Sequence, residues 1–297
     1  MHLEKLKVGV IGGRRGLGSW LVKYFADKGF EVYFSSRSDT SIIKNNIDLV
    51  QKTDLIFLSV PIQNMEGVLE EIFPYLDGKH LVEVCSVKKF LVDKYQSLKG
   101  DYPDINTHFY SIHPMFSQRI RTLKGQVILF NYASKDDGSL MPELWDIFAS
   151  NEATLYDLDY ITHDKVMGVV QGLNHFNIFV SAKTLARMSP QIGKIKDYSS
   201  PPYRIFLIFF SRYVLQDPGL YADIQMYNEF VPEVLGIFKE EVDKLFDVIQ
   251  TKDRDTFIKY VESSRFYFEE NEEDMGISNH LIEQLGRYIN KLKKEKE

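Results

Sequence analysis

Cysteine is almost absent from this chain of 297 residues, and two other common features are missing with it. The single cysteine, Cys85, has no partner for an internal disulfide, which argues against a disulfide-stabilised secreted protein. No apolar run approaches the roughly 20 residues that a membrane-spanning helix needs, and no signal segment precedes the first apolar run. We therefore expect a cytoplasmic protein without a membrane anchor.

An excess of basic charge is also lacking. The 36 Lys and Arg residues are outnumbered by 42 Asp and Glu residues, which gives a formal net charge of −6, and no long basic stripe occurs. Nucleic acid and membranes are therefore not expected as partners, whereas a small molecule is. The 44% hydrophobic and 26% charged residues are ordinary for a folded protein, and the length suggests about two domains.

The first half of the chain alternates short apolar runs with helical patterns. This alternation predicts an α/β fold, a doubly wound Rossmann-type dinucleotide-binding domain over residues 1–160. The helical patterns cover residues 19–25, 63–76 and 140–149. The expected strands are Lys7–Ile11, Glu31–Phe34, Asp54–Val60, His80–Cys85, Phe109–Ile112, Gln126–Phe130 and Ala153–Leu158.

A glycine-rich turn follows the first expected strand. Gly13, Gly16 and Gly18 precede a helical pattern, an arrangement in which backbone N–H groups and a helix N-terminus hold a pyrophosphate. Arg15 stands where the usual fingerprint has its second glycine, so its side chain either crowds the pyrophosphate or adds a positive charge beside it. We predict that this turn, with Leu17, binds the cofactor; a structural turn without a ligand is the alternative.

The end of the second expected strand bears on which cofactor is bound. Ser36 and Arg37 lie about where NAD-binding domains place a carboxylate for the ribose hydroxyls. Hydroxyl groups and an arginine suit a 2′-phosphate, so NADP is slightly favoured over NAD, unless Arg37 is only a solvated loop residue. Val60 and Pro61, at the end of the third strand, are also expected to contact the cofactor.

His113 is the first candidate for chemistry. Pro114 interrupts the hydrogen bonding of the fifth expected strand, so His113 should lie at its carboxyl end, where open α/β sheets bind ligands. A neutral imidazole whose pKa is near the working pH can accept a proton there. Ser86, after the fourth strand, should lie along the same edge. A core histidine satisfied by its neighbours is the alternative.

The second half changes to a helical period, which predicts an all-α substrate-binding and dimerisation domain over residues 161–297. Thr162 is the expected N-cap of a long, buried, apolar helix that reaches residue 188 and carries Gln171 and His175. Ser200 and Asp217 each precede proline and should begin further helices. The remaining helical patterns, with no catalytic spacing, cover residues 231–249, 255–271 and 277–292.

Two arginines lie in a very apolar segment of this half. Arg204 and Arg212 are separated by two helical turns and therefore project from neighbouring parts of one helix side. A buried cation is costly unless it is paired, and arginine binds carboxylates bidentately, so a dicarboxylate ligand would pair both. Acidic residues of this chain or of a partner subunit are the alternative.

Taken together, several segments resemble the prephenate dehydrogenase family, especially the dehydrogenase part of the bifunctional chorismate mutase/prephenate dehydrogenases. The resemblance extends over residues 7–285, and because the chain starts close to the first strand we expect no mutase domain. The segments that carry it are Ser86-Val-Lys88, His113-Pro-Met-Phe116, Leu123-Lys-Gly-Gln-Val127, His163-Asp164, Gln171-Gly-Leu-Asn-His-Phe176, Ser199-Ser-Pro-Pro-Tyr-Arg204, Arg212 and Gln216-Asp-Pro-Gly-Leu-Tyr-Ala-Asp-Ile224.

The resemblance implies NAD(P)-dependent oxidative decarboxylation of prephenate to 4-hydroxyphenylpyruvate, a step of tyrosine biosynthesis, by a homodimer. It implies that His113 accepts the proton of the ring 4-hydroxyl, that Ser86 helps to position this hydroxyl, and that Arg212 holds the ring carboxylate. The residues implied at the substrate pocket are Arg204, His175, Gln171 and Tyr221. No metal is implied.

Three other functions stay open. Arogenate or 4-amino-4-deoxyprephenate, which share the ring carboxylate and the aromatising step, could replace prephenate. Alternatively, the chain is a non-catalytic protein that binds tyrosine or prephenate, with a cofactor turn that has decayed at Arg15.

Overall fold

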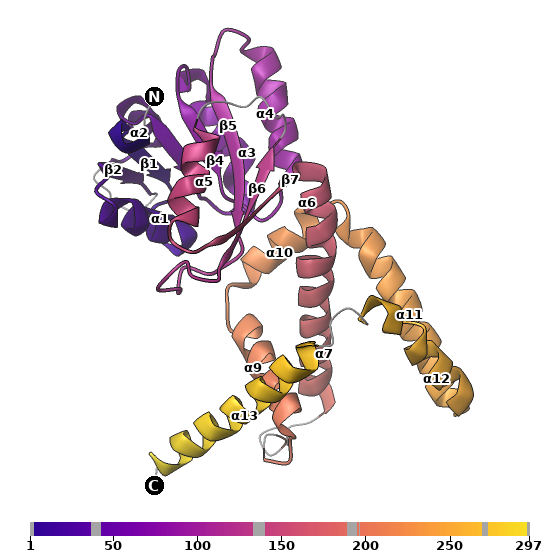
Figure 1. Cartoon of the computed structure of the whole chain (residues 1–297). Helices are drawn as coiled ribbons and strands as arrows, with labels where there is room; N and C mark the ends of the chain where they lie inside the picture. The colour runs from indigo at the N-terminus through magenta and orange to yellow at the C-terminus, as the bar shows by residue number, and fades with distance from the viewer. Residues whose placement is uncertain are drawn as a thin grey trace. The chain divides into compact units, whose positions relative to one another are not determined.

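The computed structural model describes residues 3–36, 43–132, 140–188, 195, 197–268 and 273–295. The chain forms two compact units, whose helices and strands are labelled in Figure 1. Unit 1 comprises residues 1–171 and 219–231, and unit 2 comprises residues 172–218 and 232–297. The domain boundary at 160/161 stays a prediction.

Unit 1 is built on a seven-stranded sheet with the order β2-β1-β3-β4-β5-β6-β7. The chain moves outward from β1 in both directions, so the crevice at the carboxyl ends of β1 and β3 is where doubly wound sheets bind dinucleotides. The predicted fold class is confirmed. The strands are β1 (Val8–Ile11), β2 (Val32–Ser35), β3 (Leu55–Leu58), β4 (His80–Glu83), β5 (His108–Pro114), β6 (Val127–Tyr132) and β7 (Thr154–Asp159).

Helices cover both faces of this sheet because its strands are apolar on both sides. In β3, Leu55 and Phe57 join one apolar cluster, whereas Ile56 and Leu58 join the other. The first cluster includes residues of α1 (Gly16–Asp27) and α5 (Met141–Ala149). The second includes residues of α2 (Asn46–Lys52), α3 (Ile62–Ile72) and α4 (Lys89–Asp101).

The connection from β5 to β6 differs from the predicted alternation. These strands are antiparallel, with His113 opposite Leu129 and Pro114 opposite Ile128, whereas every other neighbouring pair in the sheet is parallel. The described segment between them contains no crossover helix, and a parallel connection needs one. Pro114 is the last residue of β5, so the predicted place of His113 at the strand end holds.

The long helix predicted from Thr162 is interrupted and begins earlier. Asp159, not Thr162, is the N-cap of α6 (Tyr160–Met167), because its carboxylate accepts hydrogen bonds from the backbone N–H groups of Ile161 and Thr162. A π-helical segment, Gly168–Leu173, joins α6 to α7 (Asn174–Met188). The expectation that the whole segment is buried was wrong, since α7 buries only His175 and Ile178.

Unit 2 is entirely helical in its described residues. Its helices are α7, α9 (Pro201–Val214), α11 (Val231–Thr251), α12 (Arg254–Glu262) and α13 (Glu273–Lys294). Ser200 caps α9 as predicted. The helix predicted to extend to residue 271 ends at Glu262 and is followed by a short 3-10 turn, Arg265–Tyr267.

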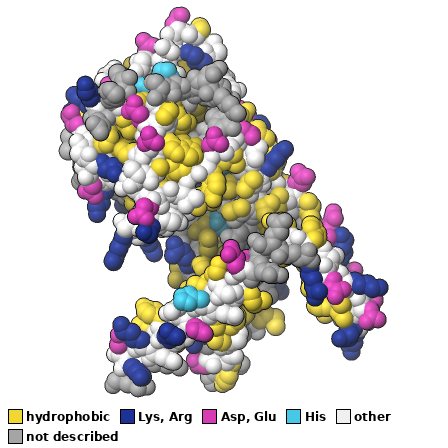
Figure 2. All heavy atoms as spheres, viewed as in Figure 1, with side chains coloured by type: hydrophobic (Ala, Val, Ile, Leu, Met, Phe, Trp, Pro, Cys, Tyr) yellow, Lys and Arg dark blue, Asp and Glu magenta, His cyan; other side chains and the backbone are white. Residues whose placement is uncertain are grey.

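Many apolar side chains of unit 2 are exposed. Figure 2 shows hydrophobic side chains at its surface among charged ones. On α11, Val242, Phe246 and Ile249 are each about half exposed and recur at helical spacing on one side of the helix. These side chains form an exposed apolar stripe along α11.

Helix α10 (Pro218–Tyr227) returns the chain to unit 1, where Ile224 joins the core cluster over α3 and α4. It begins at Asp217-Pro218, as predicted. No described helix has the length and apolar character required to cross a membrane.

Candidate functional site

The carboxyl ends of adjacent parallel strands bring the predicted residues of unit 1 to one sheet edge. The glycine turn follows β1, Val60 and Pro61 follow β3, Ser86 follows β4, and His113 lies at the end of β5. Ligands of open α/β sheets bind at this edge. The sequence pattern alone placed these residues together, and the topology agrees.

The glycine turn is too tight for side chains at three of its positions. A Cβ on Gly12, which has a φ of +83°, would lie 2.2 Å from the carbonyl oxygen of Ser59. A Cβ on Gly18 would lie 2.4 Å from the carbonyl oxygen of Gly12, and one on Gly13 would lie 2.4 Å from Phe34 Cβ. The turn therefore packs closely against the ends of β2 and β3, and only glycine fits at these three positions.

Arg15 does not fill this turn. It is the N-cap residue of α1, its side chain is exposed, and it makes no side-chain capping hydrogen bond. No acidic residue lies in the first turn of α1, which includes Gly16, Leu17 and Gly18, so the helix N-terminus suits an anion. The residues present fit the pyrophosphate of a dinucleotide, with the Arg15 guanidinium as an additional cation nearby.

The end of β2 is tied to the glycine turn. The carbonyl oxygen of Ser35 accepts hydrogen bonds from the backbone N–H groups of Gly12 and Gly13, at 3.1 and 3.2 Å. The Ser35 hydroxyl is buried and donates to Asn46 at 2.8 Å. Arg37 lies outside the described residues.

A chain of hydrogen bonds runs from His113 to the N-terminus of α4. His113 Nδ1 lies 2.9 Å from His163 Nε2, and His163 Nδ1 lies 2.7 Å from an Asp164 carboxylate oxygen. The Asp164 carboxylate accepts hydrogen bonds from the backbone N–H groups of Lys88, at 2.9 and 3.1 Å, and of Lys89, at 2.8 Å. The side chains of His113, His163 and Asp164 are all buried.

Burial keeps both imidazoles neutral. It lowers the pKa of His113 well below 6.5, and His163 and the Lys88 ammonium lower it further. Burial also lowers the pKa of His163, and Lys88 acts in the same direction. Burial raises the pKa of Asp164, whereas the backbone N–H groups of Lys89 and Lys88 lower it again. The expectation of a pKa near the working pH was therefore wrong for His113, whose neutral imidazole still has a lone pair that can accept a proton.

A buried ion pair lies beneath this sheet edge. The Lys88 ammonium donates to Glu83 Oε1 at 2.7 Å and to the carbonyl oxygens of Cys85 and Ile112 at 2.7 and 2.8 Å. Glu83 also accepts hydrogen bonds from the Ser111 hydroxyl and the Cys85 N–H. Every hydrogen of the ammonium is used, as a buried charge requires. The pair fixes the segment that carries Ser86 to the strand that carries His113.

Gln171 is the described side chain that reaches the other nitrogen of His113. Its Nε2 lies 3.4 Å from His113 Nε2, and its Oε1 is buried without a hydrogen-bond partner. Gln171 projects from the π-helical segment, a rare conformation that often marks functional positions. A small hydroxyl-bearing ligand at this point would meet both a base and an amide.

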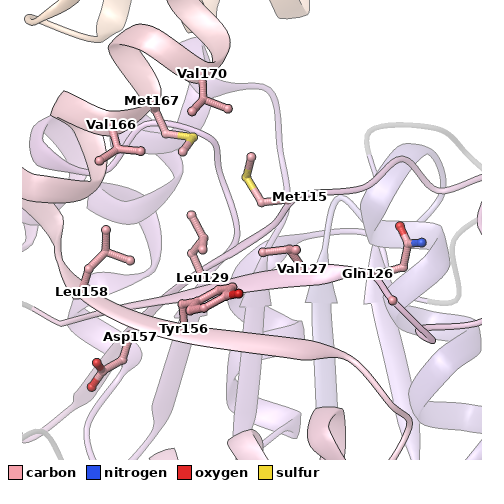
Figure 3. A pocket seen from close by; sticks show the side chains of 11 residues that line it. Met115, Gln126, Val127, Leu129, Tyr156, Asp157, Leu158, Val166, Met167 and Val170 are labelled. Carbon is pink, nitrogen blue, oxygen red and sulfur yellow. The ribbon is translucent and has the colours of Figure 1, made fainter. Parts of the chain in front are cut away.

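An apolar pocket of about 480 Å³ lies on the same sheet face as His113. Leu129 is opposite His113 in the ladder, so their side chains share a face. In Figure 3, Leu129 points from its strand toward the helical segment that carries Met167 and Val170, and Val127 and Tyr156 lie beside it on the strands. No Lys or Arg is among the residues that line it, so the pocket offers apolar contact and not carboxylate binding.

The predicted residues His175, Arg204 and Arg212 belong to unit 2, whereas Gln171 and Tyr221 belong to unit 1. His175 is buried and packs on Tyr213 of α9, with ring centroids 5.2 Å apart; burial lowers its pKa to about 4. Tyr221 of α10 is also buried.

The prediction that Arg204 and Arg212 are buried cations, which a dianionic ligand would pair, was wrong about their burial. Helix α9 has no buried residue, Arg212 is exposed, and Arg204 is only partly covered. The apolar composition of α9 does not reflect burial within this chain, since Phe206, Ile208 and Phe209 are themselves about half exposed. Both arginines stay candidates on their chemistry alone.

Sequence reasoning gave no role to His163, Asp164, Glu83 or Lys88. One signal was available: Glu83 is a carboxylate within the apolar run that was predicted as a strand, and a buried carboxylate requires a partner. His163 and His113 are fifty residues apart, and their contact depends on how α6 packs on the sheet. No local sequence pattern therefore predicts it.

Comparison with known proteins identifies both parts of the chain. Two family models match: "Prephenate dehydrogenase, nucleotide-binding domain" at residues 38–129, and "Prephenate dehydrogenase, dimerization domain" at residues 160–263. The first match begins after the glycine turn. Together the two cover most of the chain.

Individual proteins agree with these matches. The chain is 28% identical to the probable arogenate/prephenate dehydrogenase of Methanocaldococcus jannaschii, over 99% of this chain and 68% of that protein. It is 26% identical to the T-protein of Haemophilus influenzae, over 94% of this chain and 71% of that protein.

Solved structures share the fold. The prephenate dehydrogenase of Aquifex aeolicus, in complex with hydroxyphenyl propionate and NAD+, has a TM-score of 0.71 and 21% identity, covering 91% of this chain and 99% of that one. Synechocystis arogenate dehydrogenase has a TM-score of 0.64 and 19% identity, covering 89% and 99%. With both domain models matched in order along one chain, this protein belongs to the prephenate dehydrogenase family.

Proposed function

We propose that this protein catalyses the NAD(P)-dependent oxidative decarboxylation of prephenate to 4-hydroxyphenylpyruvate. The observation that carries the proposal is the buried, neutral imidazole of His113 at the carboxyl edge of the dinucleotide-binding sheet, in a chain of the prephenate dehydrogenase family.

His113 acts as the general base. The 4-hydroxyl of the ring gives its proton to His113 while the hydrogen on the same carbon leaves as hydride, so that carbon becomes a carbonyl. The bond between the ring and its carboxylate breaks and carbon dioxide departs. The electron pair of that bond completes the aromatic ring as a phenolate, which takes back the proton from His113 to give the phenol. The bound nicotinamide supplies the hydride acceptor. Aromatisation favours the reaction, so the protein mainly orients its reactants and holds the proton acceptor.

Substrate binding is assigned to residues that the family resemblance implies. Arg212 holds the ring carboxylate and Arg204 contributes positive charge, because guanidinium groups match carboxylates. Ser86 helps to orient the 4-hydroxyl from the end of β4. The remaining proposed substrate contacts are Gln171, His175 and Tyr221.

The proposed cofactor site is the glycine turn with the segments beside it. The N-terminus of α1 takes the pyrophosphate, and Ser36 with Arg37 takes the ribose, with NADP slightly favoured over NAD. Support comes from the family's nucleotide-binding domain and from the NAD+ in the similar Aquifex aeolicus structure. The proposed residues are Gly13, Arg15, Gly16, Leu17, Gly18, Ser36, Arg37, Val60 and Pro61.

A homodimer is part of the proposal. Residues 160–263 match the family's dimerization domain, and the exposed apolar side of α11 falls within that range. A second copy of the chain would cover it.

Arogenate is the second candidate substrate, since the similar Methanocaldococcus jannaschii protein is named for both arogenate and prephenate. Another relative, from Streptomyces pristinaespiralis, is a 4-amino-4-deoxyprephenate dehydrogenase. All three substrates share the ring carboxylate that Arg212 is proposed to hold.

The test is the formation of reduced cofactor from prephenate, arogenate and 4-amino-4-deoxyprephenate, each with NAD and with NADP. We expect the highest kcat/KM with prephenate and a lower dissociation constant for NADP than for NAD. Preference for another substrate would replace prephenate. No turnover with any of the three would leave a protein that only binds these ligands.

A further inference from the structure

The side chains behind His113 decide which of its two nitrogens is available. The Asp164 carboxylate accepts hydrogen bonds from backbone N–H groups at the N-terminus of α4, where the helix dipole favours a negative charge. A carboxylate accepts and does not donate, so the hydrogen between it and His163 belongs to His163 Nδ1. In neutral His163 the other nitrogen, Nε2, is then an acceptor.

The same reasoning carries to His113. Its Nδ1 lies 2.9 Å from the acceptor nitrogen of His163, so the hydrogen between the two rings belongs to His113. His113 Nε2 is therefore the nitrogen with a free lone pair. This nitrogen faces the Gln171 amide, whose N–H group can donate to it across 3.4 Å.

We propose that His163 and Asp164 are positioning residues that hold His113 in the tautomer whose Nε2 accepts the substrate proton. The proposal rests on the proposed function for the role of His113 as base, and it assigns new roles to two residues that act through His113. When the substrate hydroxyl gives its proton to His113 Nε2, the new imidazolium donates its Nδ1 hydrogen more strongly to His163. The Asp164 carboxylate stabilises this cation through the His163 ring.

The contacts favour this role over a purely structural one. Asp164 would cap α4 without any histidine beside it, and His163 would be accommodated more cheaply in the core as an apolar side chain. Instead a buried imidazole connects a carboxylate to the candidate base, and each ring nitrogen has one partner. A wrong tautomer would direct an N–H group at the substrate hydroxyl, which blocks proton acceptance.

Two amide variants of His163 distinguish its contact with His113 from its contact with Asp164. The side-chain oxygen of Gln reaches the position of a histidine Nε2, so His163→Gln keeps an acceptor for His113. Asn reaches only the position of Nδ1, so His163→Asn keeps a contact to Asp164 and leaves His113 Nδ1 without its acceptor. Both variants remove the ring and are similar in polarity, so they form a matched pair.

The experiment measures kcat and KM for prephenate and the nitrogen NMR spectrum of histidine labelled with nitrogen-15. We expect His163→Asn to lower kcat about 100-fold, as for a disabled general base, with KM within about threefold, and His163→Gln to retain most of kcat. The His113 signals, identified by their loss in His113→Asn, should show Nε2 unprotonated in wild type and a mixture of tautomers in His163→Asn.

A control makes the same acid-to-amide change at another helix N-cap. Asp253 caps α12 by accepting a hydrogen bond from Thr256, so Asp253→Asn should leave kcat and the His113 signals unchanged, whereas Asp164→Asn should alter both. Equal kcat in the two His163 variants, or a protonated Nε2 in wild-type His113, would overturn the proposal. Absence of turnover in the wild type would instead refute the proposed function, and the spectrum would still decide the tautomer.

Discussion

The proposed chemistry uses two regions, the sheet edge around His113 and helix α9. They differ in how firmly burial and hydrogen bonds within one chain fix the side chains. At the sheet edge, His113, His163 and Asp164 are buried and each is hydrogen-bonded to the next. On α9, Arg204 and Arg212 project from a helix that buries no residue. The base is fixed within one unit of one chain, whereas the arginines that would hold the carboxylates gain no such constraint from burial.

This contrast teaches that similar sequence patterns can have different causes. Both regions set polar residues within apolar surroundings. Around Lys88 and Glu83 the polar groups are paired and buried inside the chain. Along α9 and α11 the apolar residues are exposed, which fits a helix face that a second copy covers.

The largest expected effect is on stability at the sheet edge. Lys88→Met should lower the free energy of unfolding by about 3–5 kcal/mol, because it leaves the Glu83 carboxylate buried without its cation. Denaturant unfolding at a fixed protein concentration measures this loss. The double variant Lys88→Met/Glu83→Gln should recover part of it, and equal stability of Lys88→Met and wild type would show that the pair does not hold this edge.

The next effect concerns α9. Arg212→Gln should raise KM for prephenate about 10- to 100-fold, since a hydrogen bond to a charged group contributes about 1.5–3 kcal/mol. Steady-state kinetics with saturating cofactor measure it. Arg265→Gln, which changes another exposed arginine of unit 2, is the control and should leave KM unchanged. An unchanged KM in Arg212→Gln would remove this residue from the site.

Acid should destabilise the protein through its buried histidines. The pKa of His163 is lowered in the folded state, so below its unfolded value of about 6.5 the unfolded chain binds a proton that the folded chain does not. The free energy of unfolding should therefore fall as the pH drops from about 6.5 toward 4.

His163→Gln should reduce this slope by up to about 1.4 kcal/mol per pH unit, because it removes one such group. Denaturant unfolding of both proteins at several pH values gives the two slopes. Parallel slopes would mean that His163 is protonated in the folded protein.

The smallest expected effect is on assembly. Phe246→Glu should weaken the homodimer at least tenfold, because it places a charge on the exposed apolar side of α11, where Phe246 is 57% exposed. Sedimentation at several protein concentrations measures the dissociation constant. Asp243→Ala, on the same helix, is the matched control, and an unaffected dimer in Phe246→Glu would place the interface elsewhere.

Most of the fold could be predicted because its signals are local. Strand runs, the glycine turn and the prolines after Ser200 and Asp217 each act within a few residues, and the elements formed near their predicted bounds. The predictions failed where two local signals compete or where burial depends on residues distant in sequence. Asp159 outcompetes Thr162 as the N-cap of α6, and composition alone could not distinguish apolar helices buried in the chain from those left exposed.

The candidate site was predictable only in part for the same reason. His113 and Ser86 are placed by the ends of their own strands, which sequence reveals. The contact between His113 and His163 depends on α6 packing against β5, which only the tertiary structure shows. The pairing of Lys88 with Glu83, by contrast, is local in sequence, and the carboxylate in an apolar run was a signal for it.

The most direct test of the central claim compares prephenate oxidation by wild-type protein and His113→Asn, measured as reduced cofactor formed per unit time at saturating cofactor. We expect wild type to turn over and His113→Asn to lose kcat by about 1000-fold while substrate affinity is largely kept, since only the base is removed. A His113→Asn protein that turns over within a few-fold of wild type would contradict it.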